Sequence, residues 1–193
     1  MAAFVFGCIG DSITAGSHLS AGQDPVTYCA AVLTATGRYS SVTGVNEGVP
    51  ASATGDWLPN STNLNTAKTA FSGASVTHVL IMLGANDADA SVSAATYQSN
   101  LSAIAGNLIS AGYTVVLDYP TYMASPGPTL PTTYLTAIDT LTNGTTIRHG
   151  DTDAYAYFLA NPARLQADGV HPTQPGSYIL GLLWARGIST AVH

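Results

Sequence analysis

Short apolar runs alternate with longer amphipathic segments along the chain. Three of the runs, FVFGCI, HVLIML and TVVLDY, are almost continuous in apolar residues, which is typical of strands that are covered on both faces. Two weaker runs rich in β-branched residues complete the set. The five predicted strands cover residues 4–9, 41–45, 78–83, 114–119 and 145–148.

Helical patterns occupy the segments between these strands. The clearest covers residues 94–111, where Tyr97, Leu101, Ile104 and Leu108 recur at spacings of three or four residues. Further helices are predicted over residues 26–36, 132–141 and 175–189. Strands that alternate with helices predict an α/β fold with a parallel sheet and helices on both of its faces. The 193 residues fit one domain, residues 1–193, without an internal repeat or a linker.

The composition excludes two classes of partner. Only 8% of the residues are charged, the formal net charge is -6, and no basic patch or stripe is present, so we expect no nucleic-acid partner and no attraction to anionic membranes. Apolar residues make up 46% of the chain, but none of their uninterrupted runs reaches the roughly 20 residues of a membrane span. A surface rich in Ser, Thr, Asn and Gly is typical of a secreted or particle-associated protein, the alternative being a cytoplasmic one.

The first residues and the two cysteines say little about the function of the protein. A predicted strand begins within a few residues of Met1, and no positive charge precedes it, so no signal peptide is visible in the chain. Cys8 falls in the first predicted strand and Cys29 in the first predicted helix, which favours two buried free thiols over a disulfide. Their spacing matches no metal site, and we expect neither a metal nor a cofactor.

Polar residues gather where the strands end. The first three strands are followed by GDS at 10–12, NEG at 46–48 and GAND at 84–87. Because ligands bind outside the carboxyl ends of parallel strands, these clusters are expected to meet at one edge of the sheet. A fourth polar segment, DGVH at 168–171, precedes the last predicted helix, which could return it to the same edge.

The four segments together supply the parts of a nucleophilic site. The hydroxyl of Ser12 is too weakly acidic to attack an ester unaided, and His171 is the matching base. Asp168, three residues before His171, can hold the imidazole in the required tautomer. The candidate donors to the developing oxyanion are the amides of Ser12 and Gly48 and the side chain of Asn86.

These segments resemble, in their residues and order, the four sequence blocks of the SGNH (GDSL-type) esterases and lipases. The resemblance covers almost the whole chain. It implies a flavodoxin-like three-layer α/β/α fold with a five-stranded parallel sheet. It also implies Ser12 as nucleophile, His171 as base, Asp168 as its partner, and an oxyanion hole built from Ser12, Gly48 and Asn86.

The second block departs from the family pattern. That block often reads Asn-x-Gly followed closely by Ser-Gly or Gly-Gly, whereas this chain has Pro50 and Ala51 in that place. Proline has no amide proton to donate and stiffens the loop. Gly48 is therefore a weaker candidate donor than Asn86.

The predicted activity is hydrolysis of a short-chain carboxylic ester through an acyl-enzyme. The substrate expected first is an O-acetylated carbohydrate, and the runner-up is a short-chain lipid, aryl ester or thioester. Trp57, Tyr119 and Tyr122 either line the substrate pocket or pack in the core. An alternative of another class is a catalytically silent carbohydrate-binding or virion-attached module, although such a module needs no complete set of Ser12, Asn86, Asp168 and His171. The sequence does not set the oligomeric state.

Overall fold

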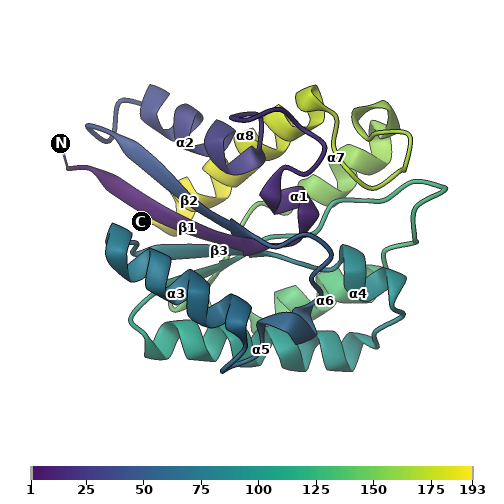
Figure 1. Ribbon diagram of the computed structural model, residues 1–193, viewed down its shortest axis with the longest axis horizontal. Coiled ribbons are helices and arrows are strands. Elements are labelled where there is room, and N and C mark those ends of the chain that lie inside the picture. The colour runs from purple at the N-terminus through teal and green to yellow at the C-terminus, as the bar shows by residue number, and fades with distance from the viewer. Residues whose placement is uncertain (1, 193) are drawn as a thin grey trace.

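A twisted parallel sheet of five strands forms the middle layer of the molecule, which we describe from a computed structural model covering residues 2–192 (Figure 1). The spatial order is β2-β1-β3-β4-β5, so the chain starts inside the sheet, adds β2 on one side and then builds outward on the other. The bounds are β1 (Phe4–Gly10), β2 (Val42–Gly48), β3 (His78–Met82), β4 (Thr114–Leu117) and β5 (Ile147–His149). The predicted α/β fold with a five-stranded parallel sheet is confirmed.

Helices cover both faces of the sheet (Figure 1). One face carries α2 (Pro25–Ala35) and α8 (Gln174–Ala191), with α1 (Ser12–Ala15) and α7 (Ala154–Ala160) on the same side. The other face carries α3 (Thr62–Ala74), α5 (Ala94–Ser110) and α6 (Thr132–Leu141), with the short α4 (Ala85–Asp89) beside them. Single 3₁₀ turns lie at Thr54–Trp57 and Pro162–Arg164.

The core consists of aliphatic and aromatic side chains from the central strands and the inner helix faces. Tyr97 of α5 and Tyr134 of α6 are fully buried and stack with their ring centroids 4.0 Å apart. Trp184 of α8 is fully buried as well. Cys8 and Cys29 are buried free thiols, and burial raises the pKa of both well above its ordinary value. These side chains hold the two helical layers against the sheet.

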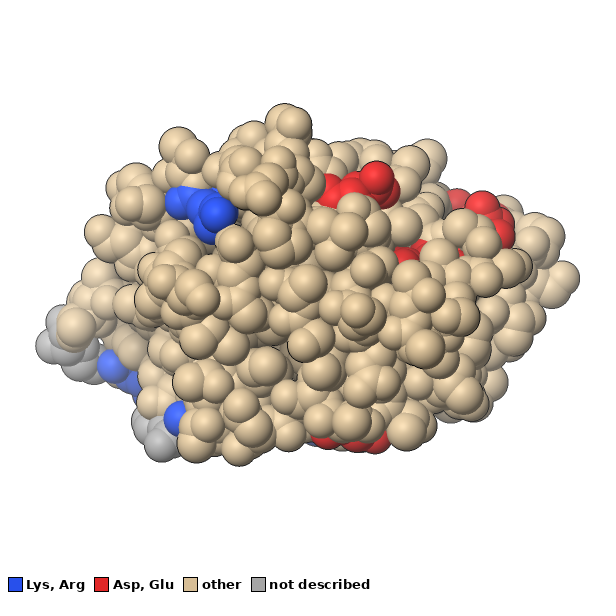
Figure 2. Space-filling view, turned by 90° about the horizontal axis from the view of Figure 1, so that it is seen from below, with Lys and Arg blue, Asp and Glu red and all other residues tan. Residues whose placement is uncertain are grey.

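The surface carries few charges. Seen from the side of α3 and α5, scattered charged side chains are surrounded by a wide expanse of other residues (Figure 2). Within residues 2–192, no helix combines the length and the apolar character that crossing a membrane would require.

Helix α3 is absent from the sequence-based expectation. Its buried face consists of Leu64, Ala67 and Phe71, while most of its other residues are Thr, Asn, Ser and Gly. Such residues favour caps and turns in isolation, so the apolar pattern is weak. The helix is stabilised by packing against the sheet and by Ser61, whose hydroxyl caps the amide of Leu64 at 3.2 Å.

Candidate active site

Strand β1 delivers Ser12 directly to the carboxyl edge of the sheet. The strand ends at Gly10, Asp11 caps the next helix, and Ser12 is the first residue of α1. The Asp11 side chain is buried and accepts a hydrogen bond from the Ile13 amide at 2.9 Å. Burial raises the pKa of Asp11 to about 6, although the Ile13 amide acts in the opposite direction. Asp11 therefore fixes the backbone around Ser12 and does not itself contact the pocket.

The segment from Asp168 to His171 is a tight turn in which the aspartate folds back on the histidine. Asp168 Oδ1 accepts hydrogen bonds from the amides of Val170 at 2.8 Å and His171 at 3.0 Å. Gly169 allows this turn because its φ is 71° and because a Cβ there would lie 2.0 Å from the carbonyl oxygen of Ala124. The turn leaves Asp168 Oδ2 free to reach the imidazole.

His171 connects Asp168 with Ser12. Its Nδ1 lies 2.7 Å from Asp168 Oδ2, and its Nε2 lies 2.8 Å from Ser12 Oγ. Burial alone would raise the pKa of Asp168, but the Val170 amide and His171 outweigh it and hold that pKa below its ordinary value. The carboxylate thus stays ionised, and Ser12 has a base within hydrogen-bond reach.

Asn86 reaches the same place from the end of β3. Its Nδ2 donates a hydrogen bond to the Ser52 carbonyl at 2.9 Å, which uses one of the two amide hydrogens. The neighbouring Asp87 is buried and points away from the pocket, accepting hydrogen bonds from the amide of Thr54 at 3.0 Å and from its hydroxyl at 2.5 Å. Asp87 therefore braces the loop after β2, and Asn86 retains one N–H for a ligand.

Gly48 does not join this group, which corrects the sequence-based expectation. Its amide donates to Asn46 Oδ1 at 3.0 Å and is not free for an oxyanion. A Cβ at this position would lie 2.3 Å from the Ala15 nitrogen. The glycine is needed because α1 packs closely against the last residue of β2.

Ala51, on the loop after β2, supplies a free amide instead. Val49, Pro50, Ala51 and Ser52 form a turn in which the Ser52 amide donates to the Val49 carbonyl at 3.2 Å. Ala51 takes the third position with a φ of 62°, a conformation that type II turns normally give to glycine. Within residues 2–192, no group accepts a hydrogen bond from the Ala51 amide. Because the adjacent Ser52 carbonyl holds Asn86, this amide lies beside the site.

A cavity of about 220 Å³ opens next to Ser12. Its lining residues are Ser12, Ala85, Asn86, Asp89, Pro128, Val170 and His171. Asp89, Pro128 and Val170 are not among the residues predicted from the sequence. The GANDAD segment places Asp89 near Asn86, but nothing in the sequence singles out Pro128, in the loop after β4, or Val170, in the DGVH turn, as a lining residue.

The three aromatic residues considered for the pocket lie elsewhere. Trp57 is fully buried and donates its indole N–H to Ser52 Oγ at 2.9 Å. Tyr122 packs edge-on against Tyr155 with ring centroids 5.7 Å apart. Tyr119 donates a hydrogen bond to Asp139. None of the three lines the pocket beside Ser12.

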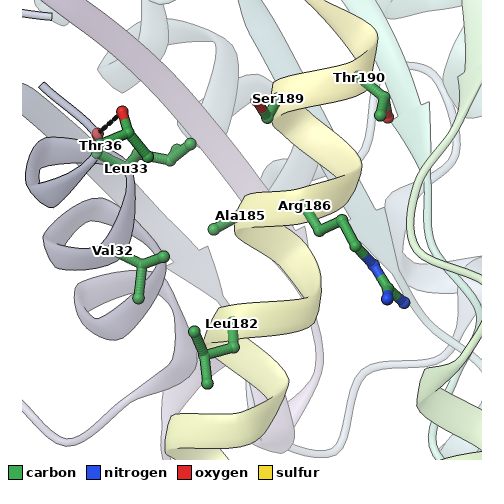
Figure 3. Close-up of a pocket in the computed structure, with 8 residues that line it drawn as sticks. All are labelled: Val32, Leu33, Thr36, Leu182, Ala185, Arg186, Ser189 and Thr190. Carbon is green, nitrogen blue, oxygen red and sulfur yellow. Dashed lines mark hydrogen bonds between the residues drawn. The ribbon is translucent and has the colours of Figure 1, made fainter. Parts of the chain in front are cut away.

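A second groove, of about 280 Å³, lies between α2 and α8 (Figure 3). Its walls are formed by the carboxyl-terminal halves of both helices, including Leu33 and Ala185, whereas His171 precedes the first turn of α8. Arg186 points away from Ala185 in Figure 3 and pairs with Asp151 and Asp153. This groove offers no nucleophile with a base beside it.

The fold and the site define the class of protein. A parallel sheet of this strand order, covered by helices on both faces and carrying a serine, a histidine and carboxylates at its carboxyl edge, is that of the SGNH hydrolases. The sequence profile of the GDSL-like lipase/acylhydrolase family matches residues 8–179, and the chain belongs to this family of esterases and acylhydrolases. No curated protein matches the chain.

Several solved structures share the fold over almost the full chain. The lipase/acylhydrolase from Enterococcus faecalis is 27% identical, with a TM-score of 0.73 over 97% of this chain and 95% of that one. A catalytic mutant of the acetylxylan esterase Axe2 from Geobacillus stearothermophilus is 21% identical, with a TM-score of 0.74 and the same coverage. A two-domain esterase active on acetylated mannans is 12% identical, with a TM-score of 0.72 over 98% of this chain and 49% of that one.

Proposed function

We propose that this protein is a serine esterase that removes short acyl groups, foremost O-acetyl groups from carbohydrate. One observation carries the proposal, namely the continuous contact from Asp168 through His171 to Ser12 beside a small open pocket. Ser12 is the nucleophile, His171 the general base and Asp168 its partner. The reaction needs no metal ion.

The reaction follows from these contacts. Ser12 Oγ attacks the ester carbonyl while its proton passes to His171 Nε2, 2.8 Å away. The negative charge that forms on the carbonyl oxygen is stabilised by the Ser12 amide, the free N–H of Asn86 and the Ala51 amide. His171 then returns the proton to the departing alcohol. Water, activated by the same histidine, attacks the acyl-serine and releases the carboxylic acid.

The pocket supports a small acyl group. Its volume of about 220 Å³ lies below the roughly 300–1,000 Å³ of most ligand pockets, so a long acyl chain finds little room. Asp89 adds a carboxylate that can accept hydrogen bonds from hydroxyl groups. A hydroxyl-rich substrate with a short acyl group satisfies both features. The carbohydrate substrates named for two of the fold relatives agree with this proposal.

Substitution of the nucleophile tests the mechanism. The Ser12→Ala variant should lose the hydrolysis of p-nitrophenyl acetate by about 10⁶-fold in kcat, as expected when a serine nucleophile is removed. Activity should survive a chelator. Undiminished turnover by Ser12→Ala would refute the mechanism, and absence of any hydrolysis by the wild type would favour the silent binding module.

Chain length and leaving group test the substrate. Rates with acetate should exceed those with octanoate, and acetylated xylan should release acetate in the presence of the wild type and not of Ser12→Ala. Faster turnover of octanoate would favour the runner-up, a short-chain lipase, and preference for aryl acetates or thioesters over acetylated xylan would favour an arylesterase or thioesterase.

A further inference from the structure

A second histidine lies against the imidazole of His171. The ring of His18 packs edge-on against it with the ring centroids 4.5 Å apart and the planes at 64°. His18 is exposed and has a φ of 70°, so its backbone is left-handed although it is not glycine. Such conformations are uncommon and costly outside glycine, and they concentrate at functional sites. Nothing in the proposed ester hydrolysis uses His18.

Three metal-ligating side chains meet at this point. His18, Asp168 and His171 each place one ligand atom so that all three atoms lie within 4.8 Å of one another. Zinc bonds of roughly 2.0–2.1 Å in a tetrahedral site put neighbouring ligand atoms about 3.4 Å apart. His18 is exposed, so rotation of its side chain is the movement by which this gap would close. A water molecule would complete the tetrahedron, as in sites with three protein ligands.

We propose that His18, Asp168 and His171 form a zinc-binding site that switches the esterase off. The inhibition rests on the proposed function, because its effect is to withdraw His171 from catalysis. Zinc coordinates the lone pair of a neutral imidazole nitrogen. Nδ1 of His171 faces Asp168 and Nε2 faces Ser12, so zinc on either nitrogen removes one of the contacts that activate the serine. Bound zinc also occupies the carboxylate that orients the imidazole.

The chemistry of the three ligands selects the metal. Two imidazoles and one carboxylate suit zinc and related late transition metals, whereas Mg²⁺ and Ca²⁺ prefer oxygen ligands in larger number. All three side chains are within reach of solvent, since the side chain of Asp168 is 42% exposed and that of His171 is 17% exposed. Zinc can therefore enter and leave without unfolding the site.

Titration calorimetry with zinc chloride on chelator-treated protein measures binding without relying on activity. The wild type should bind one zinc ion, and Ser12→Ala should bind it equally well because the hydroxyl is not a ligand. His18→Asn keeps a residue that tolerates left-handed backbone. It should weaken zinc binding by about 10- to 100-fold or more, since even the loss of a group supporting a metal ligand costs that much.

Inhibition is measured next, with p-nitrophenyl acetate and with each protein compared to its own metal-free rate. Zinc should abolish wild-type turnover, a chelator should restore it, and Mg²⁺ should have no effect. His18→Asn should remain active at a zinc concentration that silences the wild type. The matched control is His149→Asn, which removes a histidine from another aspartate–histidine pair and should stay inhibited.

Three outcomes would overturn the proposal. They are equal zinc affinity in the wild type and His18→Asn, zinc binding without inhibition of an active wild type, and inhibition that His149→Asn relieves as well as His18→Asn does. A wild type that binds zinc through His18 but shows no esterase activity even without metal would instead refute the proposed function, leaving only the metal site.

Discussion

Two aspartate–histidine pairs within residues 2–192 have the same contact distance and different surroundings. His171 Nδ1 lies 2.7 Å from Asp168, and His149 Nε2 lies 2.7 Å from Asp139. The other nitrogen of His171 meets Ser12 Oγ, whereas Nδ1 of His149 is buried without a partner in residues 2–192. What distinguishes the pair proposed for catalysis is therefore the group on the far side of the imidazole.

The two carboxylates are also held differently. Asp168 sits in a turn whose two backbone amides fix one oxygen and aim the other at the imidazole. Asp139 lies in α6, and its Oδ1 receives both His149 and the Tyr119 hydroxyl, the latter at 2.5 Å. With the tyrosine, the second pair forms a polar contact between α6, β5 and the loop after β4. In the first pair the carboxylate orients the imidazole of His171, whereas the second pair connects neighbouring parts of the fold.

Replacing each aspartate by asparagine should give the largest contrast between the pairs. In Asp168→Asn, an amide N–H facing Nδ1 favours the tautomer that carries its proton on Nε2, which cannot accept the Ser12 proton. Turnover of p-nitrophenyl acetate should fall by about 10⁴-fold in kcat. Asp139→Asn should leave kcat within about twofold, because no reacting group contacts that pair. Equal losses in the two variants would contradict the comparison.

The donor beside the first pair should give the next largest effect. Asn86→Ala removes the N–H that we propose acts on the oxyanion, so kcat and kcat/KM should fall together by about 10²- to 10³-fold. Asn161→Ala is the matched control, since the amide of Asn161 donates to the Tyr157 carbonyl outside the pocket. A rise in KM with unchanged kcat would show that Asn86 binds the ground state instead.

Backbone strain near Ser12 predicts a smaller effect, on stability. Ala51 has a φ of 62°, so Ala51→Gly should relieve strain and raise the free energy of unfolding by about 0.5–1 kcal/mol in urea titrations. Ala53→Gly is the control on the same loop. Ala53 has a φ of -101°, so the substitution relieves no strain and only increases the conformational entropy of the unfolded chain. Ala53→Gly should lower stability. The residues around Asp139 and His149 include no such strained position within residues 132–160.

The smallest expected effect is on the pH dependence of stability, through the pair of Asp139 and His149. Burial alone would raise the pKa of Asp139, but Tyr119 and His149 outweigh it and hold that pKa below its ordinary value. The stabilisation is therefore present above about pH 4, the unfolded-state pKa of aspartate, and is lost as the pH falls through the lower folded-state pKa. The wild type should exceed Asp139→Asn in unfolding free energy at pH 6 by less than about 1 kcal/mol, since the pair is half exposed, and the difference should vanish near pH 2. A difference that grows on acidification would contradict this sign.

Much of the fold could be predicted from local sequence. Each central strand is an apolar run because it is buried on both faces, and helix α5 shows its buried stripe directly through Tyr97, Leu101, Ile104 and Leu108. The pattern failed for α3, whose buried face has few apolar residues. The pattern also left open whether Trp57 lines the pocket or packs in the core, because an aromatic side chain in a loop gives no sign of which it does, and the structure places it in the core.

The candidate site, too, could be predicted from the sequence only in part. Ser12, Asn86, Asp168 and His171 could be chosen from sequence because each follows a strand end or precedes the last helix in a recognisable block. It could not be foreseen that the amide of Ala51 is free while that of Gly48 is hydrogen-bonded. This difference depends on a hydrogen bond to Asn46 and on a left-handed turn, and neither leaves a pattern in the chain.

The sequence by itself determined which residues are candidates for the chemistry and which edge of the sheet they reach, because alternating strands and helices with polar strand ends permit few other arrangements. Only the tertiary structure decided the contacts among them. Ser12 and His171 are 159 residues apart, and their hydrogen bond, like the packing of His18 on the same imidazole, exists because the sheet and α8 bring distant loops together. A hydrogen bond requires its two heavy atoms to lie about 3 Å apart, and whether they do depends on side-chain packing and not on the order of residues in the chain.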